Sequence, residues 1–221
     1  MRFHKADVLK IAAVLLVTVI ILCTIISDST QEEIAGSVVR LHILANSDSE
    51  ADQALKLKVR DAILGFVTDR YPQNAGKAEA EAYLKNSLPE IQRIARDVLA
   101  ANGSYADVKA SFGRYAFPTK AYENVSLPAG IYEAVRVEIG EAKGQNWWCV
   151  MFPPLCLADS GSLKMTDEAM LQLKKELGDG NYELITELAN TADVKVKVRF
   201  RLVELVENSK MRLAELIQNM F

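Results

Sequence analysis

Residues whose types could carry chemistry are few in this sequence and stand far apart. The chain of 221 residues has two histidines and three cysteines. His42 stands in the apolar stretch 38–45, which is typical of a β-strand. A serine or cysteine nucleophile would need His42 as its base, because His4 precedes a long apolar segment. A lone histidine in a strand is usually a packed residue, so the sequence predicts no catalytic role for it.

The acidic residues in the stretch "NSDSEAD" are candidates for a second kind of chemistry, the binding of calcium. Asp48, Glu50 and Asp52 alternate as the first ligands of a calcium loop do. Gln53, however, stands where that loop needs glycine, and Val59 stands where it needs an acid. We expect these acids to open a helix, whose positive end favours them. The sequence therefore predicts no metal ion and no other cofactor.

The tripeptide Asp159-Ser160-Gly161 matches the D-S-G motif of aspartic proteases, and apolar residues precede it. A chain of this size would have to dimerise to supply the second aspartate. The later apolar-apolar-Gly pattern that supports the flap of such proteases is missing. We therefore interpret the tripeptide as a tight turn.

Four cations alternate with apolar residues in "DVKVKVRFRL", namely Lys195, Lys197, Arg199 and Arg201. A period of two predicts a strand with one basic face. This face could dock on anionic lipid or on an acidic partner. A solvated face or a protected sheet edge is the commoner explanation for such a pattern.

The stretch "NWWCVMFPPLC" contains both tryptophans and two of the three cysteines. Cys149 and Cys156 are the only cysteines after residue 27, so they can pair in only one way. We expect them to form a disulfide, because the N-terminal segment predicts export and disulfides persist outside the cytoplasm. Free buried thiols are the alternative. Two cysteines with no nearby histidine make half a zinc site, and their spacing is not that of a redox pair.

The N-terminal segment predicts export. Residues 8–26 carry one charge, Lys10, and would span about 28 Å as a helix, close to the thickness of a hydrocarbon core. Arg2 and Lys5 also precede the uncharged part and acids follow it, which places the N-terminus in the cytoplasm and the remainder outside. We interpret the segment as an uncleaved signal anchor. A cleaved signal peptide and a lipoprotein modified at Cys23 are the alternatives.

The sequence thus divides into three parts. Residues 1–27 form the cytoplasmic tip and the transmembrane or signal-anchor segment, residues 28–37 form a polar linker, and residues 38–221 form an exported domain. The formal net charge of the chain is −3, which argues against a nucleic-acid binder, whose partner is a polyanion.

The exported part alternates between helical and strand patterns. Strands are predicted at 38–45, 105–113, 131–140, 147–152 and 193–202, with 131–140 and 147–152 forming a hairpin. Helices are predicted to begin at a capping box over 47–50, at 77 with a division at Pro89, and after Thr166, with a last one near the C-terminus. These patterns predict an α+β domain with a mostly antiparallel sheet packed with helices.

Three stretches go further as a set: "RLHILANSDSEADQALKLKVRDAIL", "SFGRYAFPTKAYENVSLPAGIYEAVRVEIG" and "NWWCVMFPPLC". They closely resemble the stage II sporulation protein R family of endospore-forming Firmicutes. The resemblance covers about residues 38–156, and "VKVRFRLVE" matches more loosely.

The resemblance implies a signalling protein rather than an enzyme. Members of that family are exported from the forespore into the space between forespore and mother cell. There they trigger a membrane-embedded aspartic protease, which cleaves the precursor of the mother-cell factor sigma E. The family brings no catalytic residue to this chain. The alternative is an exported, membrane-anchored hydrolase that acts on the cell wall.

The partner surface is expected at two turns at strand ends, where recognition residues commonly lie on a rigid scaffold. The candidate residues are Asn46, Ser47, Asp48, Trp147, Trp148, Pro153 and Pro154. Because the two tryptophans are adjacent in a strand, they must point to opposite faces of the sheet. One could fill the core while the other contacts a partner, or both could be buried.

Overall fold

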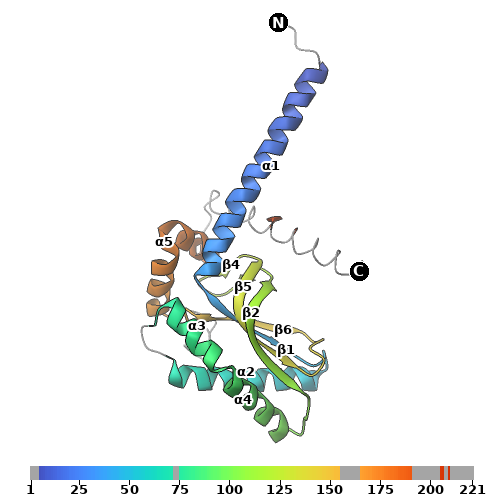
Figure 1. Cartoon of the computed structure of the whole chain (residues 1–221), viewed down its shortest axis with the longest axis vertical. Helices are drawn as coiled ribbons and strands as arrows, with labels where there is room; N and C mark the ends of the chain where they lie inside the picture. Colours follow the sequence, from blue (N-terminus) through green and yellow to red (C-terminus); the bar gives the residue numbers. More distant parts are fainter. Residues whose placement is uncertain (1–4, 72–74, 155–164, 191–204, 207–208, 210–221) are drawn as a thin grey trace.

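The computed structural model describes residues 5–71, 75–154, 165–190, 205–206 and 209, and confirms the predicted α+β class (Figure 1). The helices are α1 (Lys5–Gly36), α2 (Glu50–Arg70), α3 (Lys77–Asn86), α4 (Leu88–Ala101) and α5 (Asp167–Asn190). The strands are β1 (Val39–Leu44), β2 (Val108–Phe117), β3 (Lys120–Ala121), β4 (Ser126–Leu127), β5 (Gly130–Ile139) and β6 (Asn146–Phe152). The predicted turn at 159–161, the predicted basic strand at 193–202 and the predicted last helix fall outside the described residues.

The main sheet has four strands in the order β2-β5-β1-β6. β1 pairs in parallel with β5 and antiparallel with β6, and β2 pairs antiparallel with β5. The sheet is therefore mixed, and the prediction of a mostly antiparallel sheet is wrong. The predicted hairpin of β5 with β6 is also wrong, because β1 lies between these two strands.

The connection between β5 and β6 explains how β1 comes to lie between them. Residues 140–145 cross the end of β1, where the Gly144 amide donates to the Ala45 carbonyl at 3.0 Å and the Lys143 amide donates to the Asn46 carbonyl at 3.2 Å. Ala45 and Asn46, which follow β1 directly, thus accept hydrogen bonds that a tight β5–β6 turn would otherwise make within itself.

One face of the sheet packs against α2, α3 and α4 (Figure 1). Leu41 and Ile43 of β1 are fully buried, as are Val59 and Ile63 of α2. Ile91 of α4 is fully buried as well, and the α4 sequence places its apolar residues on one side of the helix. Burial of this apolar surface, worth about 25 cal/mol per Å², is what holds the helical layer on the sheet.

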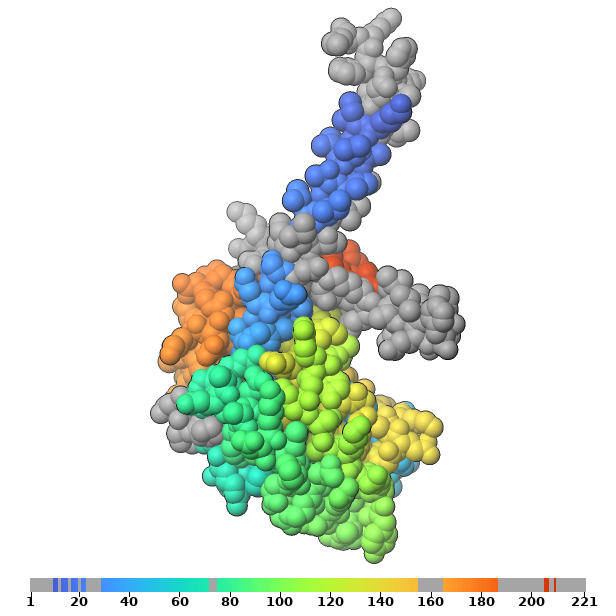
Figure 2. All heavy atoms as spheres, viewed as in Figure 1, coloured from blue at the N-terminus to red at the C-terminus, as the bar shows by residue number. Residues whose placement is uncertain are grey.

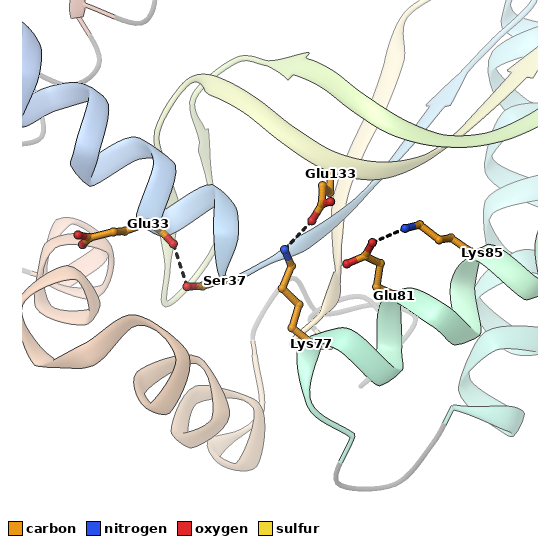
Figure 3. Close-up of polar contacts among 6 residues, drawn as sticks. All are labelled: Glu33, Ser37, Lys77, Glu81, Lys85 and Glu133. Carbon is orange, nitrogen blue, oxygen red and sulfur yellow. Dashed lines mark hydrogen bonds and ion pairs between the residues drawn. The ribbon is translucent and has the colours of Figure 1, made fainter.

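One ion pair ties the helical layer to the sheet at its margin, and a second lies within α3. Lys77, the first residue of α3, pairs with Glu133 of β5 with 2.5 Å between Nζ and Oε2, and Lys85 pairs with Glu81 within α3 (Figure 3). The Lys77 side chain is only 17% exposed, so this pair is screened less than an ordinary surface pair.

The described part of α1 is a single helix that projects from the domain at its N-terminal end (Figure 2). Residues 28–37, which were expected to form a polar linker, are helical up to Gly36 and pack against the domain. Ile34 is fully buried, and the Ser37 hydroxyl donates to the Glu33 carbonyl at 2.8 Å (Figure 3). The Asn181 side chain of α5 donates to the Glu33 carboxylate. The transmembrane helix predicted over residues 8–26 is not found in the described part of the chain, where no helix has the length and apolarity that crossing a bilayer requires.

Helix boundaries follow the sequence closely, with one correction. α4 begins beside Pro89, and Thr166 caps α5 by accepting from the Ala169 amide at 3.2 Å, both as predicted. The predicted capping box at 47–50 is wrong. Ser49 is the N-cap of α2 and accepts from the Asp52 amide at 3.1 Å, while Ser47 has another partner.

Candidate functional site

The sheet face turned away from α2–α4 carries a row of polar and aromatic side chains. Ser111, Arg136, His42 and Trp148 stand opposite one another on β2, β5, β1 and β6 in the strand register. Directly opposed residues point to the same face of a sheet, so these four side chains form one line across it. We call this line the polar row.

His42 lies at the centre of the polar row and is only 5% exposed. Its ring stacks on Trp148 with 3.8 Å between the centroids, and neither ring nitrogen has a hydrogen-bond partner of normal geometry. Burial lowers the pKa of His42 to about 4, the charges of Arg136 and Arg40 add to this, and Asn146 opposes it. His42 is therefore neutral at pH 7 and covered by Trp148, which fits a packed residue better than a general base.

Arg40 lies two residues before His42 on the same face and is fully buried. Its guanidinium carbon lies 4.2 Å from the ring centroid of Phe117 and 5.0 Å from that of Tyr132. Its Nη2 donates to the Tyr122 hydroxyl at 2.7 Å and its Nε to the Cys149 carbonyl at 3.5 Å, whereas Nη1 has no partner among the described residues. None of the ion pairs among the described residues includes Arg40, so its charge is stabilised by aromatic faces and a hydroxyl rather than by a carboxylate.

Arg136 occupies the β5 position of the polar row. Its Nη2 pairs with Oε1 of Glu138 at 2.9 Å, and its guanidinium carbon lies 5.1 Å from the Tyr115 ring centroid. Its Nε has no partner in the part of the chain that the structure describes. The Tyr115 hydroxyl is 2.9 Å from Oγ of Ser111. Arg136 is thus held in place while one of its donors stays unused.

The corner at Asn46–Asp48, predicted as a partner surface, makes internal hydrogen bonds. The Asn46 side chain accepts from the Glu141 amide at 3.0 Å, and Asp48 accepts from the Gln145 amide at 2.6 Å. The Ser47 hydroxyl donates to Asp52, and this bond together with one from Asn46 lowers the pKa of Asp52. These side chains fasten the connection between β5 and β6 to the start of α2. Asp48 and Asp52, two of the possible calcium ligands, thus accept hydrogen bonds from their own chain.

The two tryptophans lie on opposite faces of β6, as strand alternation requires, and both are partly buried. Trp147 lies on the helical side, where the Arg60 guanidinium carbon is 4.3 Å from its ring centroid. Trp148 belongs to the polar row. Pro153 and Pro154 follow the far end of β6, away from Asn46–Asp48, so the predicted surface is not one continuous patch.

Cys149 is fully buried in β6, and Cys156 lies outside the described residues. Their pairing stays a prediction. We expect alkylation of the denatured, unreduced exported protein to modify neither cysteine, because a disulfide persists in an oxidising compartment. Mass spectrometry before and after reduction measures this. Two alkylated cysteines in freshly exported protein would refute the pairing.

Sequence reasoning missed the polar row, Arg40 included. A local signal was present, since Arg40 and His42 alternate with Leu41 and Ile43 in a strand that is otherwise apolar. That alternation indicates a face with polar side chains. It does not indicate which residues of other strands complete the face. Among the described residues, no group of three or more potential metal ligands lies together.

Comparison with known proteins matches the part of the chain that contains this fold. The family model for stage II sporulation protein R matches residues 35–162, which is more than half of the chain. The stage II sporulation protein R of Bacillus subtilis strain 168 is 34% identical over 133 residues, 60% of this chain and 59% of the relative. The chain thus matches somewhat less than two thirds of that relative's length. No solved structure matches the chain significantly. The chain therefore belongs to the stage II sporulation protein R family.

Proposed function

We propose that this protein is an exported signal of endospore formation that activates a membrane-embedded aspartic protease. The protease then cleaves the sigma-E precursor in the mother cell. The chain acts as a ligand, and its N-terminal segment exports the domain into the space between forespore and mother cell.

The observation that carries this proposal is the family match over residues 35–162, which begins in the packed end of α1 and includes all strands of the main sheet. The polar groups that could carry catalysis already have contacts within the domain, which agrees with a ligand role. His42 is covered by Trp148, and the acids at 48 and 52 accept hydrogen bonds from their own chain. Export is supported by Arg2, Lys5 and Lys10 ahead of the uncharged residues 11–26.

A cell-wall hydrolase is the alternative that the experiment must separate from a ligand. Such an enzyme normally needs paired carboxylates or a metal centre, so one substitution removes activity without unfolding the protein. A ligand instead loses activity through several neighbouring residues of one surface.

We expect no single acidic residue to be indispensable for signalling. Each Asp and Glu, changed in turn to Asn or Gln, should leave processing of the sigma-E precursor within about threefold of wild type when the variant folds normally. Immunoblotting of the precursor in sporulating cells measures this, with a chain lacking residues 8–26 as the export-deficient control. One isolated carboxylate whose loss abolishes processing in a normally melting protein would favour the hydrolase.

A further inference from the structure

Among the described residues, the segments that cover the sheet face carrying the polar row lie at one end of it. There the Gln31 side chain of α1 donates to the Ile131 carbonyl at 3.5 Å, and Tyr122, from the segment between β3 and β4, meets the buried Arg40. Away from that cover, Trp148 and the ring of Tyr115, which reaches Ser111 and Arg136, are only partly buried. Partly exposed aromatic rings on a rigid sheet are the side chains that most often dominate binding energy at protein interfaces.

The charge of this face is opposite in sign to that of the whole chain. This face carries three cations, namely Lys109, Arg136 and the buried Arg40. It carries one acid, Glu138 of β5, which stands opposite Lys109. The formal net charge of the whole chain is −3. The Arg136 side chain is 28% exposed, and its Nε is buried with no acceptor among the described residues. The face is thus locally positive, and its partly exposed guanidinium could attract a carboxylate.

We propose that the polar row, together with Lys109 and Tyr115, is the surface that binds an acidic segment of the protease. This inference rests on the proposed function and names the contact within it. A carboxylate of the segment accepts from Arg136 and Lys109, and an apolar neighbour packs on Trp148. The Asn46–Asp48 corner, whose side chains already have internal partners, is not part of the contact.

A matched pair of charge reversals on β2 tests the proposal. Lys109→Glu reverses a charge on the proposed surface, and Arg114→Glu reverses one on the opposite face of the same strand. Each places a glutamate opposite a glutamate of β5, since Lys109 faces Glu138 and Arg114 faces Glu133. The cost to the fold is therefore similar for both.

The variants are compared as full-length chains, produced at graded levels together with the protease and the sigma-E precursor. We expect Lys109→Glu and Arg136→Gln to raise the level needed for half-maximal cleavage about tenfold or more, and Arg114→Glu to change it less than twofold. Equal effects of Lys109→Glu and Arg114→Glu, or no effect of Lys109→Glu, would overturn the assignment of this face as the binding surface. If the wild-type chain triggers no cleavage at any level, the proposed function fails instead.

Photocrosslinking identifies the occupant of the surface directly. A benzophenone amino acid at position 109 should crosslink to the protease, whereas the same amino acid at position 114 should not. A crosslink from position 109 to a second copy of this chain, or to lipid with no protein product, would contradict the assigned partner.

Discussion

We expect the free energy of unfolding to fall by about 3 kcal/mol between pH 7 and pH 4 through His42 alone. In the folded protein, burial first and then the charges of Arg136 and Arg40 lower its pKa from 6.5 to about 4, against the opposing effect of Asn146. The unfolded chain therefore binds a proton at His42 in this window that the folded chain does not bind. Stability from this source is complete above pH 6.5 and is lost as the pH falls toward 4, at about 1.4 kcal/mol per unit of pKa difference.

Urea unfolding at a series of pH values measures this loss, on a chain that begins at residue 28 and keeps the packed end of α1. The control is His42→Phe, which retains a ring against Trp148 but binds no proton. Carboxylates contribute equally to both proteins, so the difference between their curves isolates the histidine. Parallel curves, or an imidazole that titrates near pH 6.5 by NMR, would show that His42 is not buried as described.

The second large effect is expected at Gly144, where the connection between β5 and β6 crosses β1. A Cβ atom there would lie 2.1 Å from the Ser47 carbonyl oxygen and 2.5 Å from its carbon, so the backbone would have to move. The hydrogen bond from the Gly144 amide to Ala45 would be strained as well. We expect Gly144→Ala to destabilise the domain by about 3 kcal/mol, a size typical of overpacking against groups that cannot give way.

Gly65→Ala provides the matched control for this substitution. Gly65 lies in α2, where an added Cβ meets nothing within 4 Å, so alanine should stabilise the domain by about 0.5–1 kcal/mol through its helix preference. Thermal unfolding of both variants measures the contrast. A Gly144→Ala protein that melts like wild type would mean that the connection does not approach Ser47 as closely as the structure places it.

Local sequence patterns predicted most elements of this domain but not the neighbours of each strand. The alternation in 131–139 and the cap at Thr166 depend on residues close in sequence, and both predictions agree with the structure. The place of β1 between β5 and β6 depends on hydrogen bonds from residues 143 and 144 to residues 45 and 46, about a hundred positions away. No local pattern contains that information, and a short connection favoured the hairpin instead.

Contacts between residues far apart in sequence also explain why local patterns predicted only part of the candidate site. Asn46–Asp48 looked like a recognition turn because it is polar and follows a strand, yet the groups that use its side chains, the Glu141 and Gln145 amides, come from a distant loop. The polar row was missed because its members come from four strands, and only their register brings them into one line. The sequence names Trp147 and Trp148 together as candidates because adjacent tryptophans in a strand point to opposite faces, and it does not distinguish between them.

The central claim is that this chain activates the protease, and the most direct measurement is reconstitution outside sporulation. The full-length chain, the protease and the sigma-E precursor are produced together in growing cells that form no spores, with each of the three omitted in turn. We expect immunoblots to show a shortened precursor only when all three are present. A precursor that stays full length with all three in place, or that is cut equally well without this chain, would show that this chain does not activate the protease.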